Sequence, residues 1–301
     1  MPSRSFFPSL VVATLGAAAG AQSQWERTLT GPTPPAARFE HALAEDFDRR
    51  EVVLFGGRDP NGVLLADTWT WDGSAWIHRN PTLSPPARRN AAFAWHHSGR
   101  RVVLFGGVDA QGVVLDDLWD WDGSNWAQVV QASPRPAARA GAALASGTAD
   151  GALVLFGGID ALGVLFGDTW LWDGTQWQLA TPAIAPSARF GHRLAGDAAR
   201  ERLVLYGGFG GSADTWLWDG GAWFLVAQGS LPGPRMRHAM TWDAARARVV
   251  LHGGTDGLVY ARNDTFEFDG VAWERRTTAV LPAAVVDAAL AFDAARERTI
   301  R

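Results

Sequence analysis

A pair of adjacent glycines recurs through the chain at a nearly constant interval, and this repeat limits the possible folds more than any other feature. Each pair follows a short apolar run rich in β-branched residues, such as residues 52–55, which is typical of a buried strand. The first glycines of the pairs are Gly56, Gly106, Gly157, Gly207 and Gly253, at spacings of 50, 51, 50 and 46 residues. A repeat of this length is typical of the blades of a β-propeller.

Each repeat also carries an acidic residue and a set of aromatic residues after the glycine pair. In the first repeat, residues 69–76 read Trp-Thr-Trp-Asp-Gly-Ser-Ala-Trp and follow Asp67. Aromatic residues two positions apart lie on one face of a strand, and Asp-Gly is a strong signal for a tight hairpin turn. With a first strand predicted over residues 38–45, each repeat contains four strands, which is the size of a propeller blade.

One irregular spacing locates a loop. The acidic residue comes ten positions after the second glycine in four repeats, but Asp214 of the fourth repeat comes after only six. Loops tolerate such length changes better than strands do. The connection between the second and third strands is therefore predicted to be a loop.

Both ends of the chain contain parts of a further repeat. Residues 25–29 precede Arg38 at the distance that separates a fourth strand from the next repeat, and residues 292–296 match residues 242–246. Because an open propeller exposes unpaired strand edges, we predict an all-β propeller with five complete four-stranded blades and an incomplete sixth that the N-terminal strand closes. Repeats are expected to start near residues 38, 88, 139, 189, 235 and 285. The next glycine pair would fall two residues past Arg301, so a C-terminally truncated chain is expected.

The first 21 residues have the order of a secretory signal peptide. Arg4 precedes a mostly apolar stretch, and Ala19-Gly20-Ala21 supplies small residues for cleavage. The apolar stretch is too short for a membrane-spanning helix and is interrupted by Pro8. We predict cleavage after Ala21, a propeller domain over residues 22–301, no transmembrane segment, and a secreted or periplasmic location.

Composition excludes some functions, and the repeats account for most of the unusually high tryptophan content. The formal net charge is -4 and the basic residues are all arginines scattered through the chain, so no nucleic-acid partner is predicted. The chain has no cysteine, which excludes disulfides and thiolate metal sites. Most of its 16 tryptophans occupy the repeated aromatic positions, and we expect them to form the core between blades.

Several features that recur in register resemble kelch repeats. They are the glycine pair after an apolar strand, the Asp-Thr-Trp step, the paired aromatic residues, and a proline-rich lead into Arg-x-x-His at residues 38–41 and 189–192. The resemblance covers residues 25–301 and implies a propeller of the galactose-oxidase-type superfamily. Four residues separate Trp71 from Trp76, where the family typically has six. This shorter hairpin is similar to that of many bacterial kelch-like proteins, so a bacterial, exported member is expected.

No catalytic or metal-binding set is recognised. The copper site of galactose-oxidase-like enzymes uses two tyrosines, two histidines and a cysteine, but this chain has no cysteine and only Tyr206 and Tyr260. His96 and His97 are adjacent, so on extended backbone they point to opposite faces, and we expect them in a polar turn. No metal and no cofactor are predicted. Turn-forming roles, rather than calcium binding, are assigned to Asp59, Asp109 and Asp160.

The absence of such a set predicts a non-catalytic extracytoplasmic binding or scaffold module rather than an enzyme. Its partner is expected to be a protein or a glycan, with an anionic group among the candidates. Two alternatives stay open. One is a carbohydrate-active propeller, either a lectin or an enzyme similar to sialic-acid mutarotases, and the other is a surface adhesion protein.

The strand order indicates which face binds the ligand. In an antiparallel blade, the loops between strands two and three lie at the same end as the connections between blades, and long, variable loops usually carry function. At this end an arginine begins the first strand of each repeat: Arg38, Arg88, Arg139, Arg189 and Arg235. We interpret them as a candidate anion-binding ring, tuned by Glu40, Asn90 and Arg237. In the alternative interpretation, each arginine is structural and bonds backbone carbonyls of a neighbouring blade.

Two further sets of residues are interpreted as structural. His41, His192 and His238 recur in register and are expected to be buried. Asp67 and its equivalents are expected to accept hydrogen bonds from backbone donors where the third strand begins.

Overall fold

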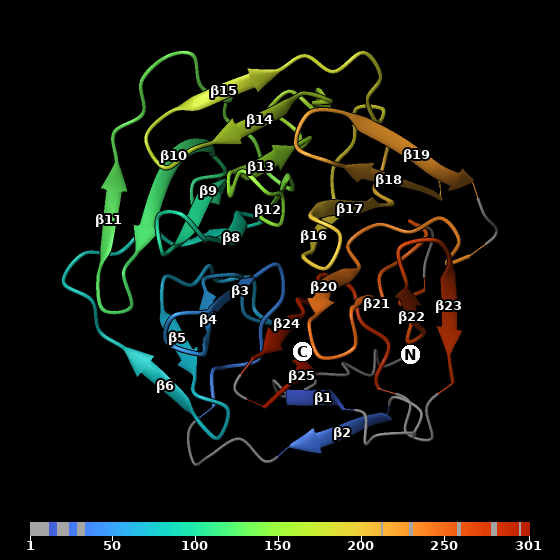
Figure 1. Cartoon of the computed structure of the whole chain (residues 1–301). Coiled ribbons are helices and arrows are strands. Elements are labelled where there is room, and N and C mark those ends of the chain that lie inside the picture. Colours follow the sequence, from blue (N-terminus) through green and yellow to red (C-terminus); the bar gives the residue numbers. More distant parts are fainter. Residues whose placement is uncertain are drawn as a thin grey trace, which may run out of the picture.

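The chain forms sheets arranged around a central axis, as Figure 1 shows. The computed structural model describes residues 12–16, 24–28, 34–211, 213–228, 231–257, 260–277, 282–294 and 296–301. Within these ranges there are six sheets and no helix, and hence no helix of the length and hydrophobicity that crossing a membrane requires. The predicted all-β propeller, with five complete blades and a smaller sixth sheet, is confirmed.

Strands pair antiparallel within each complete blade, and consecutive strands are partners except in blade 2, where the first two strands both pair with the third. Blade 1 contains β3 (Ala42–Asp46), β4 (Glu51–Phe55), β5 (Thr68–Trp71) and β6 (Trp76–Arg79). Blade 2 contains β7 (Arg88–Arg89), β8 (Ala92–His96), β9 (Arg101–Asp109), β10 (Val114–Trp121) and β11 (Trp126–Val129). Blade 3 contains β12 (Ala143–Ala145), β13 (Leu153–Phe156), β14 (Thr169–Trp172) and β15 (Trp177–Ala180).

The remaining sheets complete the ring. Blade 4 contains β16 (Arg193–Asp197), β17 (Arg202–Tyr206), β18 (Asp214–Trp218) and β19 (Trp223–Gln228). Blade 5 contains β20 (Ala239–Asp243), β21 (Arg248–His252), β22 (Thr265–Phe268) and β23 (Trp273–Arg276). The sixth sheet has the order β24 (Ala291–Asp293), β25 (Arg298–Ile300), β1 (Val12–Gly16) and β2 (Gln24–Thr28).

Aromatic residues hold each blade to the next. The tryptophan that opens the fourth strand of one blade packs on the residue just before the glycine pair of the preceding blade. Trp126, for example, lies 5.1 Å from Phe55 between ring centroids, and its Nε1–H donates to Thr68 Oγ1 at 2.9 Å. Such edge-to-face contacts combine large apolar burial with a satisfied indole donor. The predicted role of the repeated tryptophans in the core between blades is therefore confirmed.

The N-terminal strand closes the ring in the same way. Trp25 of β2 donates its Nε1–H to Thr265 Oγ1 at 3.0 Å, and its ring lies 5.1 Å from that of His252. Trp25 thus contacts blade 5 as Trp126 contacts blade 1, which confirms that an N-terminal strand completes the sixth sheet. The third strand of this sheet, β1, was not predicted, since it comes from the expected signal peptide. The other residues of that segment lie outside the described residues.

Glycine is required where backbones meet between blades. Gly56 has a φ of +64°, and a Cβ placed there would come within 2.8 Å of the backbone oxygen of Arg88 in blade 2. The neighbouring Gly57 donates its N–H to the same oxygen at 2.9 Å. The glycine pair therefore allows direct backbone contact between blades, which any side chain would obstruct.

Turn-forming aspartates behave as predicted. Asp59 Oδ1 accepts the N–H groups of Asn61 at 2.9 Å and Val63 at 2.8 Å, and the corresponding loops of blades 2 and 3 repeat this pattern. Each such loop joins the second strand to the third. The end of the propeller that carries these loops and the connections between blades is called the loop face below, and the opposite end the turn face.

Candidate functional site

A closed ring of backbone hydrogen bonds surrounds the axis at the loop face. Its members occupy one equivalent position in every repeat and are called the central ring: Glu40, Asn90, Gly141, Gly191, Arg237 and Asp287. Each N–H donates to the carbonyl of the preceding member at 2.7–3.2 Å, and Glu40 closes the circle by donating to Asp287. All six have φ between 56° and 67°. Four of them carry side chains despite this left-handed conformation, so closure of the ring holds strained backbone in place.

The charged side chains of the central ring pair with one another and with their neighbours. Glu40 lies 2.6 Å from Arg58 and 3.3 Å from Arg89, and Asn90 Nδ2–H donates to Glu40 Oε1 at 3.2 Å. Arg237 lies 3.4 Å from Asp287. Burial raises the pKa of Asp287, and the charge of Arg237 opposes this rise. The structure therefore brings three predicted site residues, Glu40, Asn90 and Arg237, into one ring around the axis.

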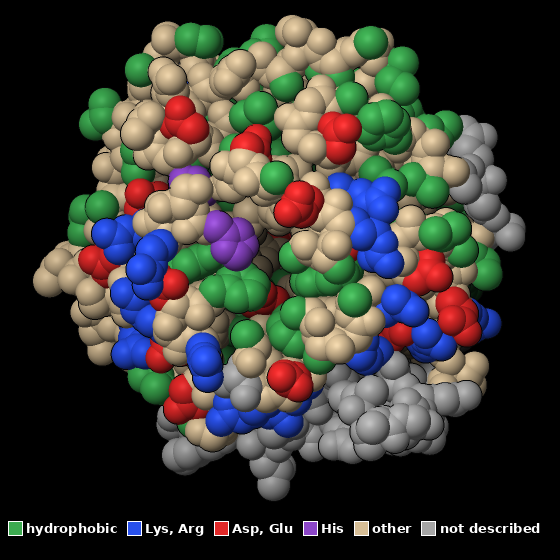
Figure 2. All heavy atoms as spheres, viewed as in Figure 1, with side chains coloured by type: hydrophobic (Ala, Val, Ile, Leu, Met, Phe, Trp, Pro, Cys, Tyr) green, Lys and Arg blue, Asp and Glu red, His purple; other side chains and the backbone are tan. Residues whose placement is uncertain are grey.

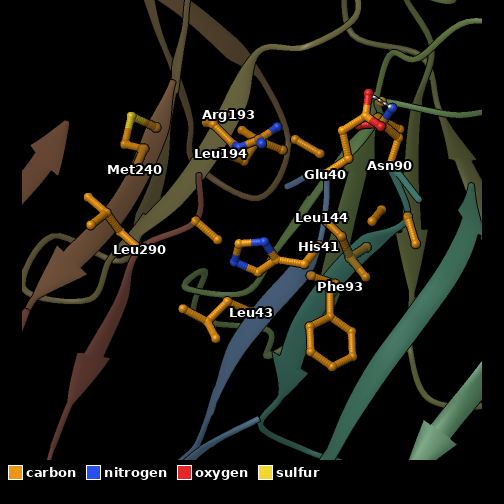
Figure 3. Close-up of a pocket in the computed structure, with 17 residues that line it drawn as sticks. Glu40, His41, Leu43, Asn90, Phe93, Leu144, Arg193, Leu194, Met240 and Leu290 are labelled. Carbon is orange, nitrogen blue, oxygen red and sulfur yellow. Dashed lines mark hydrogen bonds between the residues drawn. The ribbon is translucent and has the colours of Figure 1, made fainter. Parts of the chain in front are cut away.

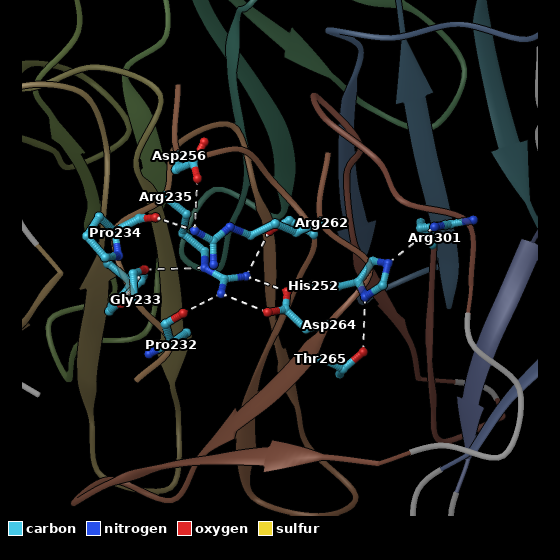
Figure 4. A network of polar contacts seen from close by, with 12 residues as sticks. Pro232, Gly233, Pro234, Arg235, His252, Asp256, Arg262, Asp264, Thr265 and Arg301 are labelled. Atoms are coloured by element: carbon cyan, nitrogen blue, oxygen red, sulfur yellow. Dashed lines mark hydrogen bonds and ion pairs between the residues drawn. The ribbon is translucent and has the colours of Figure 1, made fainter. Parts of the chain in front are cut away.

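The five arginines predicted to form an anion-binding ring are buried and already paired. Arg88 donates through both terminal nitrogens to the carboxylate of Asp117, at 2.6 and 2.7 Å, and to the carbonyl of Gly106 at 3.0 Å. The other four repeat this pattern, with Asp67, Asp168, Asp214 and Asp264 as partners. Figure 4 shows the version in blade 5. Ligand binding by these arginines stays a prediction, and the geometry supports their structural role.

Two details of that structural role differ from expectation. The carbonyls that the arginines bond belong to their own blade, since Arg88 and Gly106 are both in blade 2, and not to a neighbouring blade. The aspartates at the start of the third strand mainly bind these arginines, and in the first four blades also an indole N–H, rather than backbone donors. Burial alone raises the pKa of Asp117, but the hydrogen bonds and charge of Arg88 outweigh burial and hold this pKa below its usual value.

A different arginine lies inside the propeller. Two positions after the central ring, the inner strands carry a small residue in five repeats and a large cation in one: Ala42, Ala92, Ala143, Arg193, Ala239 and Ala289. Arg193 lines a central cavity of about 100 Å³, into which His41 also points (Figure 3). Sequence reasoning missed Arg193, although an alignment of the repeats shows it as the exception among alanines.

Arg193 has no carboxylate within 4.0 Å among the described residues. Its guanidinium group donates a hydrogen bond to the carbonyl of the adjacent His192, at 3.2 Å. Burial lowers its pKa, while the charge of Asp287 raises it and that of Arg237 lowers it further. An arginine remains protonated in proteins even so. The cavity therefore holds a positive charge that this part of the chain does not neutralise by a direct ion pair.

The histidines near this cavity are uncharged. Burial lowers the pKa of His41 to about 3, and the charges of Arg38 and Arg193 act in the same direction. Burial also lowers the pKa of His192 and His238 well below the usual value. The predicted burial of His192 and His238 is confirmed, whereas His41 is only partly buried by surface exposure. His252, which stands before the glycine pair where the other complete blades have phenylalanine or tyrosine, was not predicted.

His252 helps to fix the C-terminal end of the described chain. Its Nε2 lies 3.3 Å from a guanidinium nitrogen of Arg301, and its Nδ1 lies 3.0 Å from Thr265 Oγ1. Because Arg301 can only donate, the neutral ring accepts at Nε2 and donates from Nδ1. Figure 4 shows this contact beside the arginine network. His252 is thus a structural residue of the seam between blade 5 and the sixth sheet.

Arg193 also reaches a wider opening on the loop face. A cavity of about 290 Å³ begins at the central ring and has three guanidinium groups and two carboxylates in its lining: Arg89, Arg193, Arg237, Asp160 and Asp287. Apolar side chains complete it, among them Val114, Ile159 and Phe190. The described residues contain no group of side chains able to hold a metal ion. The opening is suited to an anionic group with apolar neighbours.

Apolar side chains are also exposed on the loops around this opening. They belong to the connections between strands two and three in all five complete blades: Val63, Val113, Leu162, Val164, Phe209 and Tyr260. A set of exposed apolar residues on one face is characteristic of a surface that contacts another molecule. The loop face therefore combines a charged centre with an apolar periphery.

Comparison with known proteins supports the family suggested by the repeats. The model of the KLHDC2/KLHL20/DRC7 Kelch-repeats domain matches residues 17–208, which is more than half of the chain. No curated protein shows significant sequence similarity to the chain. The glycine pairs, the four-stranded blades and this match agree, and the chain belongs to the kelch-repeat family of β-propellers.

Proposed function

We propose that this protein is a non-catalytic binding module that works outside the cytoplasm and holds an anionic group of a protein ligand at the loop face. The kelch propeller is a protein-binding kind of fold, which supports the general part of this proposal. The anionic ligand, the binding at the loop face and the location outside the cytoplasm are the specific part of the proposal.

Arg193 is the observation that carries the proposal. The fold does not require an arginine here, because five of six equivalent positions are alanine. Keeping a partly buried cation without a direct ion pair costs stability. A carboxylate, sulfate or phosphate entering from the loop face would offset this cost by supplying charge-assisted hydrogen bonds.

The surroundings of Arg193 favour a protein as the carrier of that anion. The exposed apolar side chains of the loops lie around the charged opening, so a folded or extended polypeptide could cover both. Glu40, Asn90 and Asp287 at the opening supply additional polar contacts that would restrict which anions fit.

The location outside the cytoplasm rests on the signal-peptide pattern of residues 1–21. Cleavage after Ala21 would remove β1, so the mature sixth sheet would lack the strand that pairs with β25 and β2. Expression with residues 1–21 in an exporting host, followed by mass spectrometry of the released protein, tests this part. A released chain that begins at Gln22 supports it, and an intact N-terminus on a protein retained in the cytoplasm refutes it.

Selection of peptides from a random phage-displayed library tests the binding proposal. We expect the enriched peptides to be acidic and to bind the purified chain. Arg193→Ala should weaken this binding by about tenfold or more, since a hydrogen bond to a charged group contributes about 1.5–3 kcal/mol. The variant should remain folded, because alanine is the residue of the other repeats.

Arg100→Ala is the matched control, since Arg100 is an exposed arginine on the turn face. Its affinity for the selected peptide should equal that of the unmodified chain. Equal affinity of Arg193→Ala and Arg100→Ala would exclude Arg193 as the anion site, and a library that yields no binding peptide would count against a peptide-binding module.

A further inference from the structure

A second cavity, of about 140 Å³, opens at the turn face. Six apolar side chains separate it from the central cavity and line both: Leu43, Phe93, Leu144, Leu194, Met240 and Leu290. They come from the inner strands of all six sheets, one position beyond the layer that contains Arg193. We call these six side chains the apolar floor, since they form the closed end of the turn-face cavity.

Residue size differs around the wall of this cavity. Blades 1, 2 and 5 contribute the large aromatic side chains Phe47, Trp95 and Trp242, whereas blades 3 and 4 contribute Ser146 and Gly196. Phe47 is 37% exposed and lies 6.2 Å from Trp95 between ring centroids. Figure 2 shows one face of the propeller, with a hollow at its centre beside hydrophobic and histidine side chains. The small residues leave the space, and the aromatic residues provide flat surfaces beside it.

The cavity is uncharged near neutral pH. Its titratable lining residues are Glu45 and His97. Burial raises the pKa of Glu45 to about 8; the charges of Asp243 and Asp293 add to this rise, while hydrogen bonds from the Phe292 N–H and the Thr241 hydroxyl oppose it. Burial lowers the pKa of His97, against the charge of Asp48. Glu45 is therefore protonated and can both donate and accept a hydrogen bond.

We propose that the turn-face cavity is a binding site for an uncharged aromatic ring that carries one hydroxyl group, the class of phenol. The ring rests on the apolar floor beside Trp242, and the hydroxyl contacts the carboxyl group of Glu45. This site is independent of the proposed anion site, because the apolar floor lies between them. It goes beyond the proposed function in both ligand and face.

The lining discriminates among ligand classes. A cavity of about 150 Å³ with an apolar lining accepts a benzene-sized molecule. A sugar ring of similar size carries hydroxyls on every edge, and those facing the apolar floor would lose their hydrogen bonds to water without replacement. An anion would meet no cation in the lining and would lie near Asp243 and Asp293. A single hydroxyl matches the single carboxyl group of the wall.

Titration calorimetry with p-cresol on the full chain tests the proposal. We expect saturable binding, and binding at least tenfold weaker for toluene and for methyl glucoside. Tetramethylammonium chloride is the fourth probe, since an aromatic wall also attracts cations. Absence of saturable p-cresol binding would overturn the proposal. Tighter binding of methyl glucoside or tetramethylammonium than of p-cresol would overturn the assigned ligand class.

Two substitutions on one exposed turn locate the site. Ala198 lines the cavity, whereas its neighbour Ala199 is also exposed and does not line it. Ala198→Trp should block the opening and weaken p-cresol binding at least tenfold, and Ala199→Trp should leave it unchanged. Because both alanines are exposed, both variants should fold. Equal binding by the two variants would place the p-cresol site elsewhere and refute the proposal.

Variants at Glu45 test the polar contact. Glu45→Gln keeps a donor and an acceptor, so it should bind p-cresol within about threefold of the unmodified chain. Glu45→Leu should reduce the affinity for p-cresol to that for toluene. If Glu45→Leu retains the preference for p-cresol over toluene, the hydroxyl does not contact Glu45 and the proposed geometry is wrong.

Discussion

Replacing Arg88 by alanine should destabilise the protein strongly, because its side chain is fully buried and bonds three partner residues. It donates twice to Asp117, at 2.6 and 2.7 Å, and once each to the carbonyls of Gly106 at 3.0 Å and Pro86 at 3.1 Å. Arg88→Ala leaves Asp117, whose side chain is only 18% exposed, without its counter-charge. Breaking a buried pair in this way costs about 3–5 kcal/mol.

The expected loss is near the lower limit of that range, at about 3 kcal/mol, since Asp117 keeps some contact with water and its bond from Trp119 Nε1–H at 2.7 Å. For a chain of this size, about 3 kcal/mol lowers the melting temperature by roughly 6–12 °C. Urea unfolding and thermal melts followed by tryptophan fluorescence measure the effect, with Arg100→Ala as the exposed control.

A double-mutant cycle separates the ion pair from the rest of the Arg88 contacts. Once Asp117 is alanine, removing Arg88 should cost clearly less than it does in the unmodified chain, because no buried carboxylate is left unpaired. A loss below about 1 kcal/mol for Arg88→Ala, or strict additivity in the cycle, would refute the structural role assigned to these arginines.

Three further predictions concern stability. Trp121→Ala should cost about 3–5 kcal/mol in a thermal or urea melt, since Trp121 is fully buried between blades 1 and 2, and an unchanged melt would contradict this packing. Folding keeps four histidines neutral that are protonated in the unfolded chain at acidic pH. Stability should therefore fall by up to about 1.4 kcal/mol per pH unit per histidine as the pH decreases from 6.5 to 3. A urea midpoint that stays constant across this interval would refute their burial. These histidines are His41, His192, His238 and His252. Because folding raises the pKa of Glu45 to about 8, its stabilising contribution is full below pH 4.5 and is lost as pH rises through 8. Glu45→Gln should therefore be more stable than the unmodified chain at pH 9 and similar to it at pH 5, and identical pH profiles would count against a protonated Glu45.

The fold was predictable from the sequence because its determinants repeat in register. Glycine pairs mark contacts between backbones, Asp-Gly marks each hairpin, and periodic tryptophans mark the faces that blades bury. Even the closing strand could be recognised, because Trp25 stands at the repeat distance from Arg38. The strand β1 could not, since its residues share none of these signals and resemble a signal peptide instead.

The candidate site was only partly predictable. The opening at the loop face followed from strand order, which placed Glu40, Asn90 and Arg237 together. The pairing of Arg88 with Asp117 spans 29 residues and has no local signal, so both were assigned other partners. Arg193 did leave a signal, as an arginine among aligned alanines. The left-handed backbone of the central ring left no such signal, because four of its six residues are not glycine, the residue that this conformation favours.

Hydrogen–deuterium exchange of the chain with and without a selected acidic peptide tests the central claim most directly. We expect the bound peptide to slow amide exchange in the central ring and in the segments at residues 57–67, 107–117 and 158–168, all on the loop face. Slower exchange confined to the turns at residues 47–50 and 97–100, or to the outer strands, would contradict it.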